Sequence, residues 1–209
     1  MNLLITGATT TFGKALCSGL RDRYSLRLTD NNALDTDLDF VQSQLGHGES
    51  TTALVKGIDA IVHLAYAPRS GDGETKWLDA NSRCHYNLLL AASEAGVNHA
   101  IILSTLDLFL PYEEHMTVSE NWKPLPTTDP SQLGAHLAEF TAREFAHSHA
   151  IDITVLRLGH VVHADKVKGQ TYDPMWLDER DAVQAIDLVL QNRSALSQRH
   201  PRNYHALHL

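Results

Sequence analysis

The stretch Met1-Asn-Leu-Leu-Ile-Thr-Gly-Ala-Thr-Thr-Thr-Phe-Gly-Lys-Ala15 decides the fold of this chain of 209 residues. Residues 3–5 form a short apolar run typical of a buried strand, and apolar side chains recur at helical spacing from Phe12 onward. Gly7 follows the run directly, where the backbone has to turn sharply. The pattern therefore predicts a strand, a tight loop and a helix. A loop of this kind ends on free N–H groups and the positive end of a helix dipole, which suits a pyrophosphate.

The loop matches a dinucleotide fingerprint at two of its three small positions. Gly7 would make the turn and Gly13 would let the helix pack on the strand, but Thr10 stands where a glycine lets the backbone approach the pyrophosphate. Because a lone glycine-rich match is weak, a βα turn without a ligand stays open as the alternative.

Composition excludes several classes of function. A net charge of −8 argues against nucleic acid or an anionic membrane as the partner. The two cysteines, Cys17 and Cys84, are no disulfide framework and fit a reducing compartment. The apolar N-terminus lacks a basic leader and no apolar run reaches the length of a membrane span, so we expect a cytoplasmic protein.

Strand patterns alternate with helix patterns along the rest of the chain. We expect strands at residues 25–29, 39–45, 60–65, 100–104 and 151–158, with a further short strand at 204–207. Helices are expected up to residue 55, with Ser50 as the cap, and at 77–95, 132–148 and 182–191, with a long irregular stretch at 110–130. The alternation predicts a doubly wound parallel α/β sheet of the Rossmann type. Residues 1–191 would form one dinucleotide-binding domain with a reduced substrate lobe, and residues 192–209 a tail.

Four residues fall at the carboxyl ends of the predicted strands, which is where open parallel sheets bind ligands. They are Gly7, Asp30, Ala65 and Ser104. Asp30 lies about 20 positions past the loop, where a carboxylate takes the ribose hydroxyls of NAD and repels the extra phosphate of NADP. Asp30 with the two asparagines after it is equally good turn chemistry. Paired with the glycine loop, it favours NAD.

The chain resembles the extended short-chain dehydrogenase/reductases, in particular the NAD-dependent epimerase/dehydratase group, from residue 2 to about 191. The resemblance rests on six motifs in family order: residues 6–13, residues 57–65, Asn81 with Asn87, Ser104 with Thr105, residues 156–159 and residues 178–185. The Leu-Arg-Leu-Gly run at 156–159, followed by Trp176 and Leu177, is similar to sugar- or uronate-oxidising members.

The resemblance implies roles for individual residues. Thr105 lies where the family places a catalytic Ser or Thr that hydrogen-bonds the substrate oxygen. The expected cofactor-binding residues are the pyrophosphate loop with Asp30 for the adenosine ribose, then residues lining the dinucleotide channel: Gly7, Thr9, Thr10, Thr11, Phe12, Gly13, Asp30, Leu64, Ala65, Tyr66, Asn81 and Ser104.

The family's Tyr-x-x-x-Lys pair is missing from its expected place. If Glu139 marks the register, Ser131 occupies the tyrosine position and Ala135 the lysine position. A serine hydroxyl is too weak an acid to replace the phenol, and losing a general acid–base typically costs about 10²–10⁴ in rate. Thr10 and Ala135 should both weaken NAD binding. Gln44 also stands where members often have an Asp near the adenine.

Other residues were weighed as the proton-transfer group or as metal ligands. Tyr112, Lys123 and His136 are the alternatives for a base, although each fits a surface or packing role better. His160 and His163 with Asp165 form the best local group for a metal, but they lack a defined ligand spacing and we expect no metal site. The histidines of the tail, His200, His205 and His208, are expected on a solvated end.

Three hypotheses of function follow. The first is a nucleotide-binding relative that is non-catalytic or weakly catalytic because the Tyr-x-x-x-Lys pair is lost. The second is an active NAD-dependent oxidoreductase or epimerase on a sugar, a nucleotide sugar or a uronate, using Thr105 and a non-standard base. The third is a ligand-free scaffold, a homodimer formed through the helices that contain Asn81 and Glu139.

Overall fold

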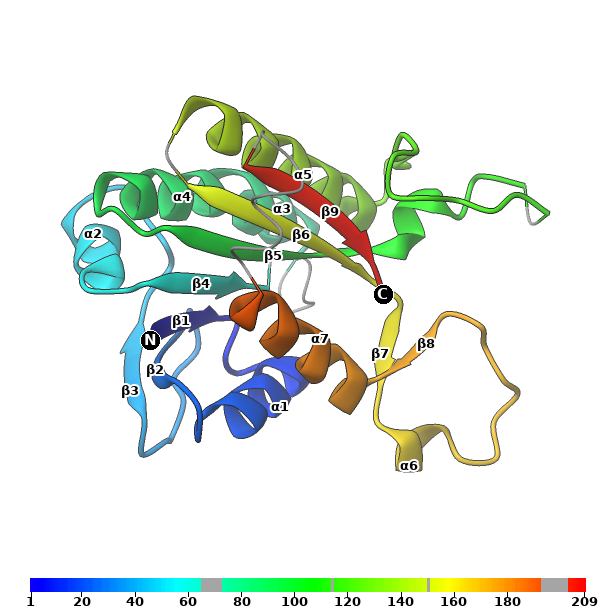
Figure 1. Ribbon diagram of the computed structural model, residues 1–209, viewed down its shortest axis with the longest axis horizontal. Coiled ribbons are helices and arrows are strands. Elements are labelled where there is room, and N and C mark those ends of the chain that lie inside the picture. The colour runs from blue at the N-terminus through cyan, green and yellow to red at the C-terminus, as the bar shows by residue number, and fades with distance from the viewer. Residues whose placement is uncertain (65–72, 114, 150, 193–202) are drawn as a thin grey trace.

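The computed structural model describes residues 1–64, 73–113, 115–149, 151–192 and 203–209. A seven-stranded parallel sheet in the order β3-β2-β1-β4-β5-β6-β9 forms the centre of the molecule (Figure 1). The order confirms the doubly wound α/β prediction. The strands are β1 (Asn2–Thr6), β2 (Ser25–Asp30), β3 (Asp39–Gln42), β4 (Ala60–His63), β5 (His99–Thr105), β6 (Asp152–Leu158) and β9 (Tyr204–His208).

Helices cover both faces of this sheet (Figure 1). One face carries α1 (Thr11–Leu20) and α7 (Glu179–Gln191), and the other carries α2 (Glu49–Val55), α3 (Glu74–Asp79), α4 (His85–Glu94) and α5 (Pro130–Ser148). A turn of π-helix, η1 (Ala80–Cys84), joins α3 to α4, and a 3₁₀ turn, η2 (Leu106–Phe109), follows β5. Beyond β6 lie β7 (His160–Val162), α6 (Ala164–Val167) and β8 (Trp176–Asp178), with β7 and β8 paired as a small parallel ribbon.

The sheet separates two apolar cores because alternate residues of each strand point to opposite faces. In β1, Leu4 packs in the core under α2, α4 and α5, whereas Leu3 and Ile5 pack in the core under α1 and α7. The central strands are buried on both faces, so they are almost continuously apolar, as parallel strands between two helix layers are.

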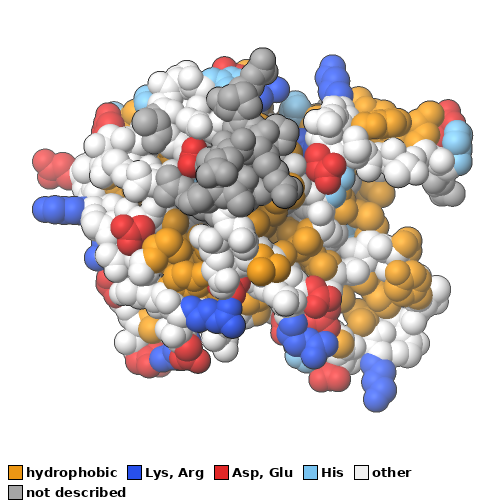
Figure 2. All heavy atoms as spheres, viewed as in Figure 1, with side chains coloured by type: hydrophobic (Ala, Val, Ile, Leu, Met, Phe, Trp, Pro, Cys, Tyr) orange, Lys and Arg blue, Asp and Glu red, His pale blue; other side chains and the backbone are white. Residues whose placement is uncertain are grey.

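Strand register brings the carboxyl ends of the central strands to one edge. Thr6 at the end of β1 is opposite Thr29 of β2, and Thr105 at the end of β5 is opposite Leu158 at the end of β6. Two segments project from this end of the molecule, the irregular stretch before α5 and the β7–α6–β8 unit, with a notch between them in the space-filling view (Figure 2).

Two local predictions about helices were wrong. Ser50 does not cap α2: the helix begins after Gly48, whose φ of +124° suits glycine, and Ser50 lies inside the first turn. The single helix expected at residues 77–95 is interrupted by the π-helical turn of η1. Helical periodicity could not reveal this turn, because the inserted residue only shifts the phase of the pattern.

The C-terminal segment also differs from expectation. The strand predicted at residues 204–207 exists as β9, and it pairs in parallel with β6 along its whole length. As a result His205 is buried, not solvated as predicted, and only 6% of it is exposed. The error arose because composition near a chain end does not report pairing with a strand about 50 residues earlier.

Candidate functional site

The glycine loop has the geometry of a tight strand-to-helix turn. Gly7 follows β1 with a φ of +65°, a conformation that glycine adopts at little cost. A Cβ atom on Gly13 would lie 2.2 Å from the Gly7 carbonyl oxygen, so only glycine allows α1 to approach the loop this closely. The two outer positions of the fingerprint therefore have the physical roles that the sequence predicts for them.

Thr10 takes a role in the loop that the fingerprint does not include. It is the N-cap of α1: its Oγ1 donates to the Gly7 carbonyl oxygen at 2.7 Å and accepts from the Gly13 amide at 3.0 Å. The cap satisfies one first-turn amide, while the amides of Thr11 and Phe12 have no acceptor within the helix. An anion at this helix terminus would meet those two amides and not that of Gly13.

Asp30 lies at the carboxyl end of β2, as predicted, and is almost fully buried. One carboxylate oxygen accepts the Thr9 amide at 3.1 Å, and the other accepts the Asn32 amide at 3.2 Å. The side chain thus serves the glycine loop and the turn after β2 at the same time. The two alternatives left open by the sequence, ribose ligand and turn residue, are compatible in this geometry.

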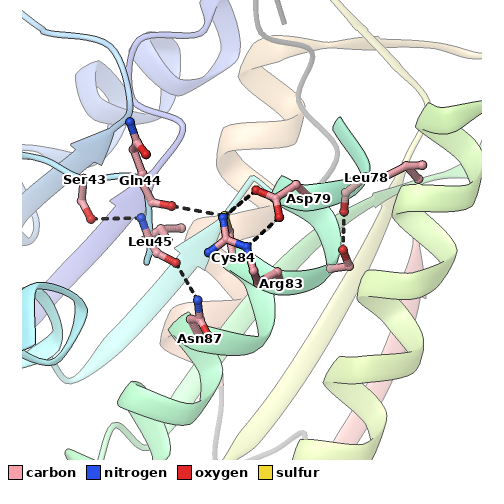
Figure 3. Close-up of polar contacts among 9 residues, drawn as sticks. Ser43, Gln44, Leu45, Leu78, Asp79, Arg83, Cys84 and Asn87 are labelled. Atoms are coloured by element: carbon pink, nitrogen blue, oxygen red, sulfur yellow. Dashed lines mark hydrogen bonds and ion pairs between the residues drawn. The ribbon is translucent and has the colours of Figure 1, made fainter. Parts of the chain in front are cut away.

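The segment after β3 is fastened to the π-helical turn at the same edge of the sheet (Figure 3). The Cys84 thiol donates to the Gln44 carbonyl oxygen at 3.2 Å, and Asn87 Nδ2 donates to the Leu45 carbonyl oxygen at 3.0 Å. Arg83 clamps Asp79 with two hydrogen bonds of 2.7 and 2.6 Å on the neighbouring turn. Gln44, expected near the adenine, is held through its backbone, and the residue is exposed.

A cavity of about 480 Å³ opens at the carboxyl ends of β1, β4, β5 and β6. It brings the helix end of the glycine loop together with Leu64, Ser104 and Thr105, as the predicted site requires. The described residues that line it are Thr10, Thr11, Phe12, Leu64, Leu103, Ser104, Thr105, Asp107, Leu158, Gly159, His160, Val161, Val162, His163, Lys166, Val167 and Glu179. Ala65 and Tyr66, expected in the dinucleotide channel, lie outside the described residues.

Ser104 and Thr105 end β5 and have different partners. Ser104 Oγ donates to Glu139 Oε1 at 2.6 Å, and Glu139 in turn pairs with Arg157 through two hydrogen bonds of 2.9 and 2.8 Å. Thr105 Oγ1 accepts the Asp107 amide at 3.1 Å and caps η2. The Thr105 hydroxyl lines the cavity, and its proton stays available to donate.

Ser131 and Ala135 do not line the cavity. Ser131 is in the first turn of α5, where both its amide and its hydroxyl donate to the Asp129 cap. Ala135 is 1% exposed and packs in a small apolar cluster with Leu108 and Phe109. Ser131 therefore helps to cap α5, and Ala135 packs α5 against η2.

Asn81 sits in the π-helical turn and is buried. Its Nδ2 donates to the Trp77 carbonyl oxygen at 3.0 Å, and its Cβ lies 3.1 Å from where Gly134 of α5 would carry a Cβ. Among the described residues no donor reaches its Oδ1. Asn81 is not among the described residues of the cavity wall, so its expected cofactor contact has no counterpart in the cavity lining.

His160, weighed from the sequence only as a metal ligand, lines the cavity between two carboxylates. Its Nε2 lies 3.0 Å from Asp107 Oδ1 and its Nδ1 lies 3.3 Å from Asp173 Oδ2. Partial burial lowers the pKa of His160, but the hydrogen bonds and charges of Asp107 and Asp173 outweigh it and hold the pKa above its usual value. His163 also lines this cavity, and its Nε2 lies 3.6 Å from Glu179 Oε1.

The other residues weighed as a base lie elsewhere. Tyr112 donates its hydroxyl to the Lys123 carbonyl oxygen at 2.8 Å and packs against Trp122. Lys123 and His136 line a second cavity of about 700 Å³ between the irregular stretch, α5 and β9. Burial lowers the pKa of His136. In the described part of the chain, no group of three or more His, Cys, Asp or Glu side chains is placed to hold a metal.

A sequence model of the NAD dependent epimerase/dehydratase family matches residues 3–174. A search of curated protein sequences gives no match. Among the described residues, no helix combines the length and the hydrophobicity needed to cross a membrane.

Solved structures share the fold at low sequence identity. MoeE5 in complex with UDP-glucose and NAD is 21% identical over 100% of this chain and 76% of its own, with a TM-score of 0.80. Uronate dehydrogenase from Agrobacterium tumefaciens is 23% identical over 91% of this chain and 71% of its own, with a TM-score of 0.79. UDP-glucose-4-epimerase from Stenotrophomonas maltophila, with bound NAD, is 19% identical over 100% of this chain and 77% of its own, with a TM-score of 0.79.

Proposed function

The chain belongs to the NAD-dependent epimerase/dehydratase family, and from that membership we propose that it binds NAD at the glycine loop and has lost the Tyr-x-x-x-Lys route of proton transfer. The observation that carries the proposal is the contrast between the glycine loop and α5. The loop keeps the close approach of Gly13 to Gly7 and the carboxylate of Asp30, whereas Ser131 and Ala135 are committed to α5.

The residues present fit NAD. The first-turn amides of Thr11 and Phe12 would face the pyrophosphate, and Asp30 would take the adenosine ribose. Leu64 and the ends of β5 and β6 would line the nicotinamide half, because they form the wall of the cavity beyond the loop. When bound, NAD supplies a two-electron oxidant, and the chain's own residues position the substrate and handle the proton.

The loss of the proton-transfer pair is supported by what surrounds its two positions. Ser131 has both its amide and its hydroxyl on the Asp129 carboxylate. A lysine at position 135 would have to displace the apolar contacts that Ala135 makes with Leu108 and Phe109. Restoring the pair would therefore require repacking of α5 against η2.

Thermal unfolding with increasing NAD or NADP tests the binding. NAD at about 100 times its dissociation constant should raise the free energy of unfolding by about 2.7 kcal/mol. NADP should stabilise less, because the Asp30 carboxylate repels the extra phosphate. Asp30→Asn should narrow the difference between the two cofactors, whereas Asp35→Asn on the exposed turn should not. Absence of stabilisation at millimolar NAD would refute the proposal.

A second candidate function is an active oxidoreductase or epimerase on a sugar, a nucleotide sugar or a uronate. It is favoured by the cavity, which places the Thr105 hydroxyl beside the glycine loop and among polar side chains. The test is to mix the protein and saturating NAD with uronic acids, aldoses and nucleotide sugars, one at a time. An increase in NADH absorbance would show that the protein oxidises that compound. Failure of the whole panel would leave the non-catalytic binding protein.

We also propose that the protein forms a homodimer through its outer helix layer. Tyr86 of α4 and Phe140 of α5 are 48% and 51% exposed on the outer helix layer, where a second copy would cover them. Sedimentation of the wild type against Phe140→Glu would show whether that face holds two copies together. Cys17 and Cys84 are both buried thiols that are not joined by a disulfide, which supports a reducing compartment such as the cytoplasm.

A further inference from the structure

We propose that His160, held by Asp107, is the group that exchanges a proton with the substrate in the cavity of the glycine loop. The inference rests on the proposed function, because NAD must bind beside it. It assigns a catalytic role to a residue of β7 and not to α5, the helix on which we expect the family's pair.

The geometry joins three groups in series along one wall. Thr105 ends β5, and its Oγ1 accepts the Asp107 amide at 3.1 Å. Asp107 Oδ1 then lies 3.0 Å from His160 Nε2. Thr105, Asp107 and His160 all line the same cavity as Thr11 and Phe12 of the loop. A hydroxyl bound to Thr105 would therefore lie near an ionisable ring whose orientation is fixed by a carboxylate.

His160 is suited to proton exchange and not only to packing. Its side chain is 45% exposed toward solvent, whereas that of Asp107 is 15% exposed. An aspartate beside one ring nitrogen fixes the tautomer and stabilises the imidazolium, which is the arrangement that makes histidine an effective base. The ring contacts both carboxylates, Asp107 through Nε2 and Asp173 through Nδ1.

The charged groups around His160 are of both signs. Asp107 faces it from η2 and Asp173 from the segment between α6 and β8. The same cavity wall also holds His163, the N-cap of α6, with Lys166 of α6 and Glu179 of α7. The two aspartates are in direct contact and dominate, so removing either one should lower the proton affinity of the ring.

The proposed step is the oxidation of a secondary alcohol. When bound, NAD would supply the two-electron oxidant that takes the carbinol hydrogen with its bonding electron pair. The substrate hydroxyl would take the place of Asp173 Oδ2, 3.3 Å from Nδ1, and would give its proton to Nδ1 of the neutral imidazole, while Nε2 keeps its proton on Asp107 and the C–O bond becomes a carbonyl. His160 is left as the imidazolium, and its Nδ1 returns to Asp173 when the carbonyl product leaves. In the reverse direction the imidazolium returns the proton to the carbonyl oxygen.

The first experiment follows His160 without relying on turnover. An NMR titration of the histidine ring protons should find His160, identified by its loss in His160→Gln, with a pKa above the usual value of about 6.5. Asp173→Asn should lower that pKa, and Asp107→Asn should lower it as well. A His160 that titrates at its usual value in the wild type, unchanged in both variants, would overturn the proposal.

The second experiment links this titration to catalysis. His160→Gln should leave NAD affinity, measured by calorimetry, unchanged but lower kcat for the best alcohol of the sugar panel by about 10²–10⁴. His147→Gln, the same change on the exposed end of α5, should match the wild type. In Asp173→Asn the acid limb of the pH profile should move to lower pH together with the NMR pKa, because a weaker base loses its proton earlier.

The outcomes separate the two proposals. If NAD does not bind the wild type, the proposed function fails and the role of His160 fails with it. If NAD binds but the wild type oxidises no member of the panel, or if His160→Gln turns over as fast as the wild type, only the role of His160 is overturned. An acid limb that stays in place while the NMR pKa moves would likewise exclude His160 as the base.

Discussion

The glycine loop and α5 differ in what holds them in place. The loop depends on backbone: a positive φ at Gly7, the missing Cβ of Gly13 and amides at a helix terminus. The α5 region depends on side chains, of which the buried Glu139–Arg157 pair is the centre. Binding by backbone tolerates change at neighbouring positions, whereas chemistry by side chains is lost when two residues change.

On the function proposed above, this difference would let a family member keep cofactor binding without the Tyr-x-x-x-Lys pair. Thr10 replaces the middle glycine of the fingerprint, and the loop keeps its fold because the Thr10 side chain caps α1. Ser131 and Ala135 leave α5 folded, since a serine on a cap and an alanine in an apolar cluster are both good packing solutions. Four substitutions test this contrast, and they are given in order of decreasing effect.

Glu139→Ala should have the largest effect on stability. Both side chains of the Glu139–Arg157 pair are only 5% exposed, so the change leaves a buried guanidinium without its carboxylate. The free energy of unfolding in urea should fall by about 3–5 kcal/mol. Glu144→Ala, which breaks an exposed pair with Arg143 on the same helix, should change it by about 0–1 kcal/mol. Equal effects of the two variants would show that the buried pair is not the centre of this region.

The second prediction concerns His85, which is buried at the start of α4 and stacks on His63. Burial lowers the pKa of His85 from 6.5 to about 4. The unfolded chain binds this proton more tightly than the folded chain. The contribution of neutral His85 to the free energy of unfolding is therefore complete above pH 6.5 and is lost as the pH falls toward 4. It amounts to roughly 3 kcal/mol, at 1.36 kcal/mol for each unit of pKa.

Urea unfolding at pH 7 and pH 4 would measure this effect. His85→Leu should shrink the difference between the two conditions relative to the wild type, whereas His147→Leu, on an exposed site, should leave it unchanged. A pH dependence that is the same in wild type and His85→Leu would place the acid sensitivity elsewhere in the molecule.

Gly13→Ala should damage the loop. The added Cβ would lie 2.2 Å from the Gly7 carbonyl oxygen, so α1 has to move away from β1. We expect a loss of about 1–3 kcal/mol in unfolding free energy and loss of NAD binding in calorimetry. Gly46→Ala is the control, because nothing lies within 4 Å of its Cβ position and its φ is ordinary. NAD binding that survives Gly13→Ala would mean that the close approach is not needed.

Thr10→Gly should have the smallest effect, and in the opposite direction for binding. It frees the Gly13 amide from Oγ1 and restores the small middle residue of the fingerprint. A gained hydrogen bond of about 1 kcal/mol corresponds to roughly fivefold tighter NAD binding. Because glycine is an acceptable N-cap, unfolding should change by only a few tenths of a kcal/mol. Weaker binding of NAD would show that the Thr10 cap itself preorganises the site.

Much of the fold could be predicted because its signals are local. The β1–loop–α1 unit, the order of strands and helices and the position of Asp30 follow from periodicity, glycines and turn residues close in sequence. The failures are also local in kind. The N-cap of α2 is Gly48 and not Ser50. The π-helical turn at 80–84 leaves no recognisable signal in the spacing of the apolar residues.

The contact between Asp107 and His160 could not be predicted in the same way. Asp107 and His160 are 53 residues apart, and they meet only because β5 and β6 are neighbours that end together. From the sequence, His160 was grouped with His163 and Asp165 as a candidate metal site, because the three residues are close along the chain. The structure gives His160 different partners, Asp107 and Asp173, and a place in the cavity wall.

The amino-acid sequence alone determined a strand, a glycine loop and a helix, and around them an alternating parallel sheet with an acidic residue after its second strand. The tertiary structure alone shows that Ser104 donates to Glu139 of the Glu139–Arg157 pair, that His205 is buried in β9, and that His160 contacts Asp107 in the cavity wall. The physical reason is range. Turns and helix starts are set by sterics and hydrogen bonds within a few residues, whereas the partner of a polar side chain depends on which strand ends lie side by side.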